Sequence, residues 1–274
     1  MPFVLNEMAR RLKAFMALAL LICLPMPVVG AALARPSLEP RNFLKASVAD
    51  SLEIASFPAR MEARDWALLA LPAVGLFGLT LADPQLYPRL RGKQDWLEAS
   101  MPVATQFGEG LYAALGTAAL WGLGEAAQSP RLAQASATAL ESMAFCAVAS
   151  AGLKYAFNAN RPSDRDDRHD FFTAGISGTP SFPSGHSMVA FALAEVYGEA
   201  YGRYWTYPLA AVVGYSRIYL GAHWPSDVAA GALVGAALGH ACVAAAREKG
   251  VPSRLRFTTL PLQNGLLASV NLGF

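Results

Sequence analysis

Charged side chains are scarce in this chain. Asp, Glu, Lys and Arg make up 15% of its 274 residues, while 54% are hydrophobic; a soluble domain carries about 25% charged residues. This composition excludes a disordered chain, disfavours an ordinary cytosolic enzyme, and favours Ala-rich helices packed in or against a membrane. The 22 basic and 20 acidic residues leave a net charge of +2, so we expect no nucleic-acid partner.

Cysteine is also rare. Cys23, Cys146 and Cys242 are too few for a disulfide framework, and each lies in an apolar run. The two later thiols are typical of small buried side chains. The sequence contains no CxxC pair and no Cys/His cluster, so we expect neither a metal nor another cofactor.

The N-terminus has the layout of a secretory signal peptide. Three basic residues precede an apolar run at about 15–29, and Ala32-Leu33-Ala34 offers a cleavage site with small residues. We interpret residues 1–34 as a signal peptide, with an uncleaved membrane anchor as the alternative. Either interpretation directs the chain to the cell envelope.

A polar, proline-containing linker at 35–65 precedes a predicted all-α core over 66–247. Six apolar segments in this core have the length of helices, and some are long enough to span a bilayer. The simplest architecture is a six-helix up-and-down bundle. The segments lie at about 66–82, 103–123, 132–157, 187–202, 205–221 and 226–246.

Four glutamates, at positions 109, 141, 195 and 199, fall inside these predicted helices. Because charges at bilayer depth are costly, they favour a periplasmic bundle that lies on a membrane over an integral one. The number of crossings adds a constraint. If all six helices span the membrane after a cleaved signal peptide, the end of the bundle that carries residues 154–161, 183–186 and 216–227 would face the cytoplasm. Integral and peripheral arrangements both remain open.

The tail, residues 248–274, has a different pattern. Asn264-Gly265 is a strong hairpin signal, and apolar residues alternate with other residues from Leu266 to Phe274. A terminal Phe on such a strand resembles the last strand of an outer-membrane barrel. Since one hairpin cannot form a barrel, we expect a β-hairpin packed on the helical core.

Three stretches stand apart as candidates for chemistry. In the first, Lys154 and Arg161-Pro162 stand seven residues apart, which would place two cations on one helix face. An anion between them would explain the pair; the alternative is two cations that favour the dipole at a helix C-terminus. Residues 163–182, which follow, form a charged loop.

The second stretch, Pro183-Ser184-Gly185-His186, opens a predicted helix. Ser184 or a neighbour can cap this helix, Gly185 permits close approach of a ligand, and free N–H groups at the helix start can bind an anion. A Ser-Gly pair at a helix start is common, so this stretch is weak evidence when taken alone.

The third stretch runs from Ser216-Arg217 to His223 and Asp227, with Pro225 near the first position of a helix. Asp227 lies one turn from His223, so its carboxylate can hold one imidazole nitrogen and leave the other free to attack. The alternative is a loop histidine beside an acidic residue of a first helical turn. The remaining histidines, His169 and His240, are interpreted as structural or incidental.

Together, the three stretches resemble the signature of the type 2 phosphatidic acid phosphatase superfamily, which includes bacterial acid phosphatases and vanadium haloperoxidases. That signature is Lys, six residues, Arg-Pro; then Pro-Ser-Gly-His; then Ser-Arg, five residues, His, three residues, Asp. Every fixed position is present here in order and spacing. The resemblance covers about residues 66–247.

The resemblance implies a role for each of these residues. His223 would be the nucleophile that forms a phosphohistidine, oriented by Asp227, and His186 would act as general acid and then as general base. The phosphate cage would consist of Lys154, Arg161, Arg217 and the N–H groups of Ser184 and Gly185, and it would need no metal.

The implied activity is a phosphatase at one end of the bundle, facing the periplasm. Its substrate would be a lipid such as phosphatidate, an isoprenyl pyrophosphate or lipid A, met at a membrane surface. Hydrolysis of soluble phosphate esters is the alternative within this class. Vanadate-dependent halide oxidation and a purely structural envelope role are alternatives outside it.

Overall fold

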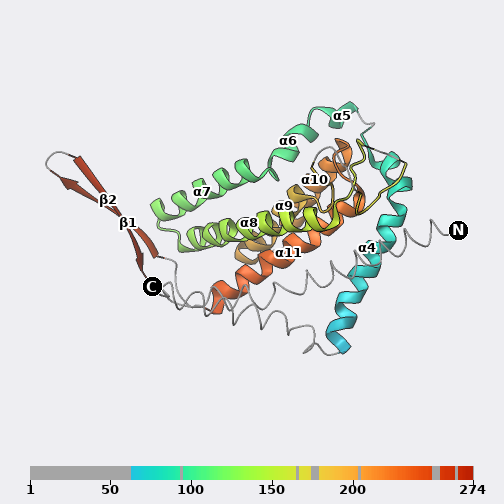
Figure 1. The fold of residues 1–274 in the computed structure, drawn as a ribbon. Helices are drawn as coiled ribbons and strands as arrows, with labels where there is room; N and C mark the ends of the chain where they lie inside the picture. The colour runs from blue at the N-terminus through green and yellow to red at the C-terminus, as the bar shows by residue number, and fades with distance from the viewer. Residues whose placement is uncertain are drawn as a thin grey trace.

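The computed structural model describes residues 63–92, 95–164, 167–173, 179–202, 205–248, 254–262 and 265–273. The predicted signal peptide and the linker up to residue 62 lie outside the described residues. The expectation of an all-α core is confirmed for the described part of residues 66–247 (Figure 1). The helices are α4 (Ala63–Leu90), α5 (Asp95–Glu98), α6 (Met101–Gln106), α7 (Gly110–Ala126), α8 (Pro130–Phe157), α9 (Gly185–Tyr201), α10 (Thr206–Tyr219) and α11 (Pro225–Glu248).

The prediction of one continuous helix over 103–123 is wrong. The chain breaks at residues 107–109, between α6 and α7. A Cβ atom at Gly108 would lie 2.8 Å from the carbonyl oxygen of His186, so only glycine permits this approach. Glu109 is the N-cap of α7, where its carboxylate accepts hydrogen bonds from the N–H groups of Leu111 and Tyr112 at 2.9 and 3.0 Å. Its charge therefore stabilises a helix start instead of lying inside a span.

Close packing of α9 against α11 forms the centre of the fold. Gly231, Gly235 and Gly239 repeat every four residues on α11, and a Cβ atom on each would approach a backbone carbonyl of the α9 segment within 2.0–2.7 Å. Such a stripe of small residues lets two helix backbones come together. α8 and α10 also pack on α9, and buried side chains such as Met188 fill the space between them.

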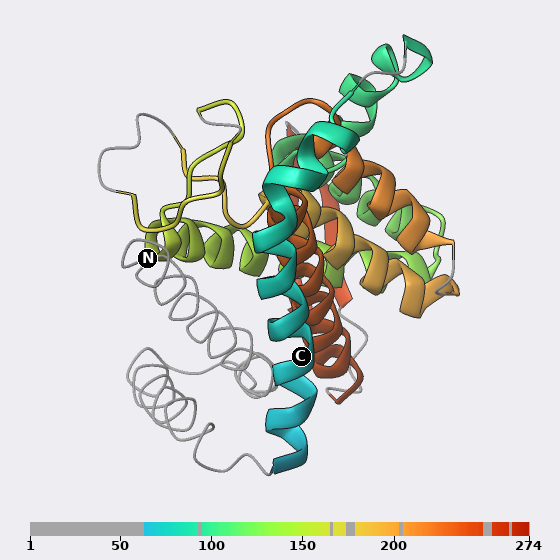
Figure 2. The ribbon, with the colours of Figure 1, turned by 90° about the vertical axis from the view of Figure 1, so that its right-hand side faces the viewer.

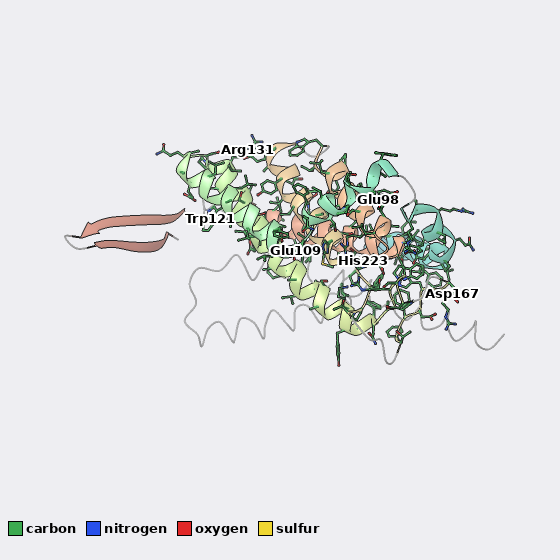
Figure 3. The ribbon with its side chains drawn as sticks, turned by 90° about the horizontal axis from the view of Figure 1, so that it is seen from above. Glu98, Glu109, Trp121, Arg131, Asp167 and His223 are labelled. Atoms are coloured by element: carbon green, nitrogen blue, oxygen red, sulfur yellow. The ribbon has the colours of Figure 1, made fainter. Side chains whose placement is uncertain are left out.

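The helix ends that carry the three motifs lie at one end of the core. Figure 1 shows the end of α8, the start of α9, the end of α10 and the start of α11 gathered near the upper part of α4. Figure 2 shows α4 lying along α11. Figure 3 shows His223 within the helices and Asp167 further out at the same end, whereas Trp121 lies toward the other end.

Two antiparallel strands follow the helices. β1 (Arg254–Leu262) pairs with β2 (Gly265–Gly273), with Leu262 opposite Gly265. Asn264 of the predicted turn lies outside the described residues. Figure 1 shows the strands extending away from the helices, so the expected packing on the helical core is not seen for these two strands.

Two described helical segments are long and apolar enough to cross a membrane by length and composition, namely Pro130–Phe157 and Pro225–Ala244. Several large apolar side chains are also exposed. Leu71, Leu115 and Val148, on three different helices, each expose more than half of their surface.

We predict that Gly235→Ala destabilises the protein, because the added methyl group would meet the Met188 carbonyl oxygen at 2.0 Å. Overpacking of this kind costs about 1–3 kcal/mol. The matched control is Gly122→Ala on α7, where nothing lies within 4 Å of an added Cβ atom. Thermal unfolding in detergent should show a lower midpoint for Gly235→Ala alone; equal midpoints for both variants would contradict the close α9–α11 contact.

Candidate active site

His223 and Asp227 form a buried pair at the start of α11. The Nδ1 atom of His223 lies 3.3 Å from Oδ2 of Asp227, and the two side chains are 3% and 0% exposed. The same carboxylate oxygen accepts the backbone N–H of Trp224 at 2.8 Å. Pro225 is the first residue of the helix and Asp227 lies in its first turn, as the sequence predicts. Because Nδ1 faces the carboxylate, Nε2 is the imidazole nitrogen left to react.

The start of α9 is tied to the start of α11. Ser184 is the N-cap of α9, and its hydroxyl accepts the N–H of Ser187 at 3.4 Å. The backbone N–H of Ser184 donates to the Asp227 carbonyl oxygen at 3.0 Å. This corrects the prediction that the Ser184 N–H group binds phosphate, since that group already has a partner. The predicted helix start and cap are confirmed, and Gly185 is half-buried beside them.

Lys154 and Arg161 do not share a helix face, which corrects the sequence interpretation. α8 ends at Phe157, and Asn158 adopts a left-handed conformation with φ of 39° that turns the chain away. Arg161 therefore reaches the site from the following loop, where its Nη1 atom donates to the Ala222 carbonyl oxygen at 2.9 Å.

The loop before α9 holds both of these cations. The Nζ atom of Lys154 donates to the carbonyl oxygens of Pro180 and Ser181 at 2.6 and 3.2 Å. The Nε atom of Arg161 donates to the Thr179 carbonyl oxygen at 2.9 Å. This one segment therefore supplies backbone carbonyl oxygens to both positive charges.

Arg217 approaches from the last turn of α10, where its Nη1 atom donates to the hydroxyl of Thr105 at 2.6 Å. Thr105 lies on α6, so the α6–α7 segment contributes to the site through this contact. It also contributes through Gly108, which packs on the backbone of His186. Sequence reasoning missed Thr105, because no motif marks a lone threonine in an apolar helix.

Burial and the three cations together lower the pKa values of the two histidines. Burial, together with the charges of Lys154, Arg161 and Arg217, holds the pKa of His223 well below its usual value. Burial, followed by the charge of Arg217, lowers the pKa of His186 to about 4. Three cations around two neutral imidazoles form a site that attracts an anion.

Sequence reasoning also missed His169, Asp83 and Ser181. His169 is fully buried: its Nδ1 atom lies 2.8 Å from Oδ2 of Asp83, and its Nε2 atom lies 3.5 Å from Oδ1 of Asp227. The Ser181 hydroxyl donates to Oδ2 of Asp227 and lies 3.4 Å from Nδ1 of His223. His169 is thus not an incidental loop residue, whereas His240 lies away from the site and pairs with Glu195 on α9 at 2.9 Å.

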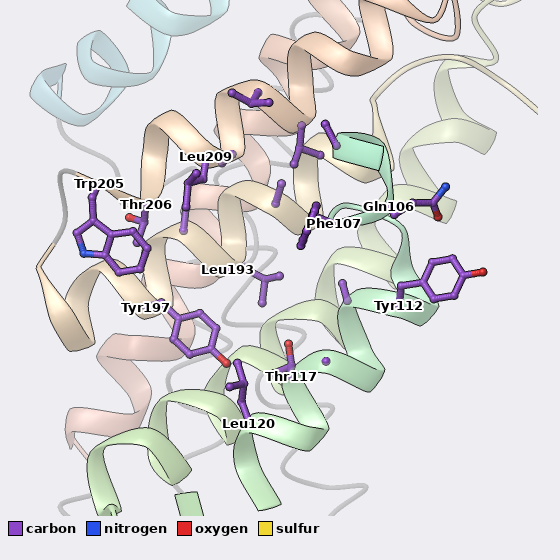
Figure 4. A pocket seen from close by; sticks show the side chains of 18 residues that line it. Gln106, Phe107, Tyr112, Thr117, Leu120, Leu193, Tyr197, Trp205, Thr206 and Leu209 are labelled. Carbon is purple, nitrogen blue, oxygen red and sulfur yellow. The ribbon is translucent and has the colours of Figure 1, made fainter. Parts of the chain in front are cut away.

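An apolar groove opens beside the site, with a volume of about 930 Å³ (Figure 4). Leu193 and Tyr197 of α9 face it from one side and Thr117 and Leu120 of α7 from the other. Its lining residues come from four helices and include Ala104, Gln106, Phe107, Gly116, Ala190, Ala194, Trp205, Leu209, Ala210 and Val213.

One end of the groove adjoins the charged site. Ala104 and Gln106 flank Thr105, which holds Arg217. Ala190 lies one turn beyond His186 on α9, and Val213 lies one turn before Arg217 on α10. From His186 to Tyr197, α9 extends over roughly 16 Å at 1.5 Å per residue. A phosphate in the site and an apolar chain in the groove would therefore be neighbours.

Part of the chain matches a known family model. Residues 135–250 match the model of the PAP2 superfamily, which confirms the resemblance drawn from the three motifs. This region contains Lys154, Arg161, His186, Arg217 and the His223–Asp227 pair.

The chain is similar to curated lipid phosphatases over short stretches. It is 38% identical over 89 residues to a lipid A 1-phosphatase of Rhizobium johnstonii, which covers 31% of this chain and 36% of the relative. It is 44% identical over 59 residues to a decaprenylphosphoryl-5-phosphoribose phosphatase of Mycobacterium tuberculosis, which covers 22% and 33%. The chain thus spans about a third of the length of these relatives.

Among solved structures, the chain is similar to a transmembrane PAP2 type phosphatidylglycerolphosphate phosphatase from Bacillus subtilis. The identity is 22%, the TM-score is 0.48, and the match covers 68% of this chain and 98% of that one.

We predict that the protein loses stability as the pH falls from about 6.5 toward 4. Unfolded histidine has its ordinary pKa of about 6.5, whereas the folded values of His186 and His223 are lower. The unfolded state therefore binds more protons in this window, so acid favours unfolding. Thermal unfolding midpoints measured from pH 7 to pH 4 should fall less steeply for His186→Gln; an equal slope in wild type and variant would contradict the lowered pKa of His186.

Proposed function

We propose that this protein is a lipid phosphatase that transfers a phosphoryl group to His223 and then to water. The observation that carries the proposal is an apolar groove whose lining flanks Thr105, the partner of Arg217, and begins one turn beyond His186 on α9. Such a site suits a substrate with a phosphate head and a long apolar chain. Similarity to curated phosphatases of lipid A and decaprenyl lipids supports the same class of substrate.

In the proposed first step, Nε2 of His223 attacks phosphorus while Asp227 holds Nδ1. The bond between phosphorus and the leaving oxygen breaks as the phosphorus–nitrogen bond forms. Protonated His186 gives its proton to the leaving oxygen. The attack turns His223 into an imidazolium. The Asp227 carboxylate stabilises this positive charge, because its Oδ2 atom lies only 3.3 Å from Nδ1 of His223.

In the second step, neutral His186 accepts a proton from water, and the resulting nucleophile attacks phosphorus. The phosphorus–nitrogen bond breaks, inorganic phosphate leaves, and His223 returns to its neutral form. Lys154, Arg161 and Arg217, with the Gly185 N–H group, stabilise the developing charge on the phosphoryl oxygens. These fixed cations supply the charge that Mg²⁺ provides in other phosphoryl-transfer sites, so we propose that no metal takes part.

Substrate binding lets His186 act as an acid despite its low pKa. Burial, followed by the charge of Arg217, lowers the pKa of this imidazole to about 4 and so favours its neutral form. A bound phosphate dianion places negative charge among the cations, which favours the protonated form and raises the pKa of His186. The substrate itself thus prepares the proton donor.

We also propose that the protein works at a membrane of the cell envelope, with its site facing the periplasm. Exposed apolar side chains on α4, α7 and α8, the two long apolar helices and the groove support contact with lipid. In this arrangement, α4 and α7–α11 form the six-helix up-and-down bundle, with the site at one end and the β1–β2 hairpin beyond α11.

We predict that His223→Ala abolishes both turnover and formation of a phosphoenzyme from a ³²P-labelled substrate. His186→Ala should retain some activity on p-nitrophenyl phosphate, because its leaving group needs little protonation, and lose activity on an alkyl phosphate. Arg217→Ala should reduce kcat by about 10²-fold.

The assays contain EDTA; a rate that EDTA removes and Mg²⁺ restores would contradict the metal-free mechanism.

We predict that Gly116→Leu raises KM for a long-chain lipid phosphate about tenfold and leaves p-nitrophenyl phosphate hydrolysis unchanged. Gly116 lines the groove, and nothing lies within 4 Å of an added Cβ atom, so the new side chain narrows the groove without a clash. The control is Gly122→Leu on the same helix, which has equal space but does not line the groove. Equal KM values in all three proteins would favour a phosphatase of soluble esters.

A further inference from the structure

The catalytic pair continues into a second buried pair of side chains. On one side, His223 contacts Asp227, and on the other side Asp227 faces His169 at 3.5 Å. His169 in turn lies 2.8 Å from Asp83, near the end of α4. Asp83, His169 and Asp227 are each 0% exposed. The result is a row of alternating carboxylates and imidazoles that joins α4, the 167–173 loop segment and α11.

The proton count in this row bears on the charge state of His169. Each of its two ring nitrogens faces a carboxylate oxygen, of Asp83 at Nδ1 and of Asp227 at Nε2. A neutral imidazole carries a single N–H group, so one carboxylate would then face a lone pair. An imidazolium presents an N–H group to each carboxylate. At Nε2 the 3.5 Å contact with Asp227 is an ion pair and not a hydrogen bond, and the positive charge there balances charge that would otherwise be costly to bury.

The surroundings of His169 suit a cation held in one orientation. Its ring stacks on the indole of Trp224, with centroids 5.2 Å apart and an interplanar angle of 21°, and an aromatic face attracts a cation. Asp83 is itself fixed by Ser226, whose backbone N–H donates to Oδ1 at 3.0 Å and whose hydroxyl donates to Oδ2.

The first motif holds the loop that carries His169. Asn160 lies between Lys154 and Arg161, and its side chain bonds to the backbone on both sides of His169. It donates to the Arg168 carbonyl oxygen at 3.1 Å and accepts the backbone N–H of Asp170. The segment that brings Arg161 into the site thus also sets the position of His169.

We propose that His169 is a positioning residue for phosphoryl transfer, held as an imidazolium between Asp83 and Asp227 so that Asp227 keeps the geometry that orients His223. This proposal rests on the proposed function for its kinetic consequence, but the charge of His169 can be measured without turnover. His169 acts through Asp227 and does not itself touch the substrate.

The charged groups that affect the protonation of His169 come from several elements. Asp83 of α4 and Asp227 of α11 face His169 directly. Beyond Asp227 lie Lys154 of α8 and His223, and the Arg168–Asp170 ion pair flanks His169 in its loop at 2.7 Å. Loss of the His169 charge leaves the Asp227 carboxylate less compensated, so Asp227 then favours protonated His223 more strongly.

The kinetic test compares His169→Gln with wild type. We expect kcat to fall at least tenfold with KM within twofold, because the cage is intact, and the acid limb of the kcat/KM profile to move to higher pH. Asp83→Asn should shift the limb in the same direction. The controls are Phe171→Leu, which loosens the packing against His169, and His240→Gln, which breaks a histidine–carboxylate pair away from the site. An unmoved acid limb in His169→Gln, or an equal shift in Phe171→Leu, overturns the positioning role.

The charge test uses ¹⁵N NMR of histidine-labelled protein in detergent at pH 7. Only four histidines are present, so single variants assign each signal. We expect both ring nitrogens of His169 to carry protons in wild type, and one to lose its proton in Asp83→Asn. A neutral His169 in wild type overturns the proposal whether or not the protein is a phosphatase, while a charged His169 in a protein without phosphatase activity would reject the proposed function alone.

Discussion

The buried carboxylate of Asp227 is the group on which the site depends. Burying an isolated charge in a dry interior is energetically unfavourable. Here hydrogen-bond donors from several parts of the chain stabilise the carboxylate. Oδ2 accepts from the Trp224 N–H and the Ser181 hydroxyl, and it faces His223. Ser181 lies on the loop whose carbonyl oxygens also hold Lys154, and Trp224 directly precedes α11. The fold of this end of the protein therefore places its segments around one charge.

The sequence predicts the site well where chemistry and helix starts coincide. Pro225 at the first position of α11 and Ser184 as the cap of α9 follow local rules that need no tertiary contact. The gathering of the three motifs at one end follows from helix order. The spacing of Lys154 and Arg161 was misleading, because a left-handed residue at Asn158 ends the helix between them.

Other features depend on tertiary contacts that no local pattern reports. The break at residues 107–109 exists because Gly108 packs against the backbone of His186, more than seventy residues later. The predicted first helix stopped at residue 82, whereas α4 continues to Leu90 and so brings Asp83 to His169. A histidine in a charged loop gives no sign in the sequence that it will be fully buried. Such pairings become visible only when distant segments meet.

The glycine stripe on α11 has a consequence for how this fold can diversify. A Cβ atom at Gly231 would lie 2.4 Å from the carbonyl oxygen of Ser184, two residues before His186, so the same contact that packs α9 on α11 also fixes His186 relative to His223. The α6–α7 segment, by contrast, borders the groove and reaches the site through Thr105, Gly108 and the charge of Glu109. Substitutions along that segment can change the shape of the groove while the two imidazoles keep their relation, so the groove and the charged site can vary separately in this architecture.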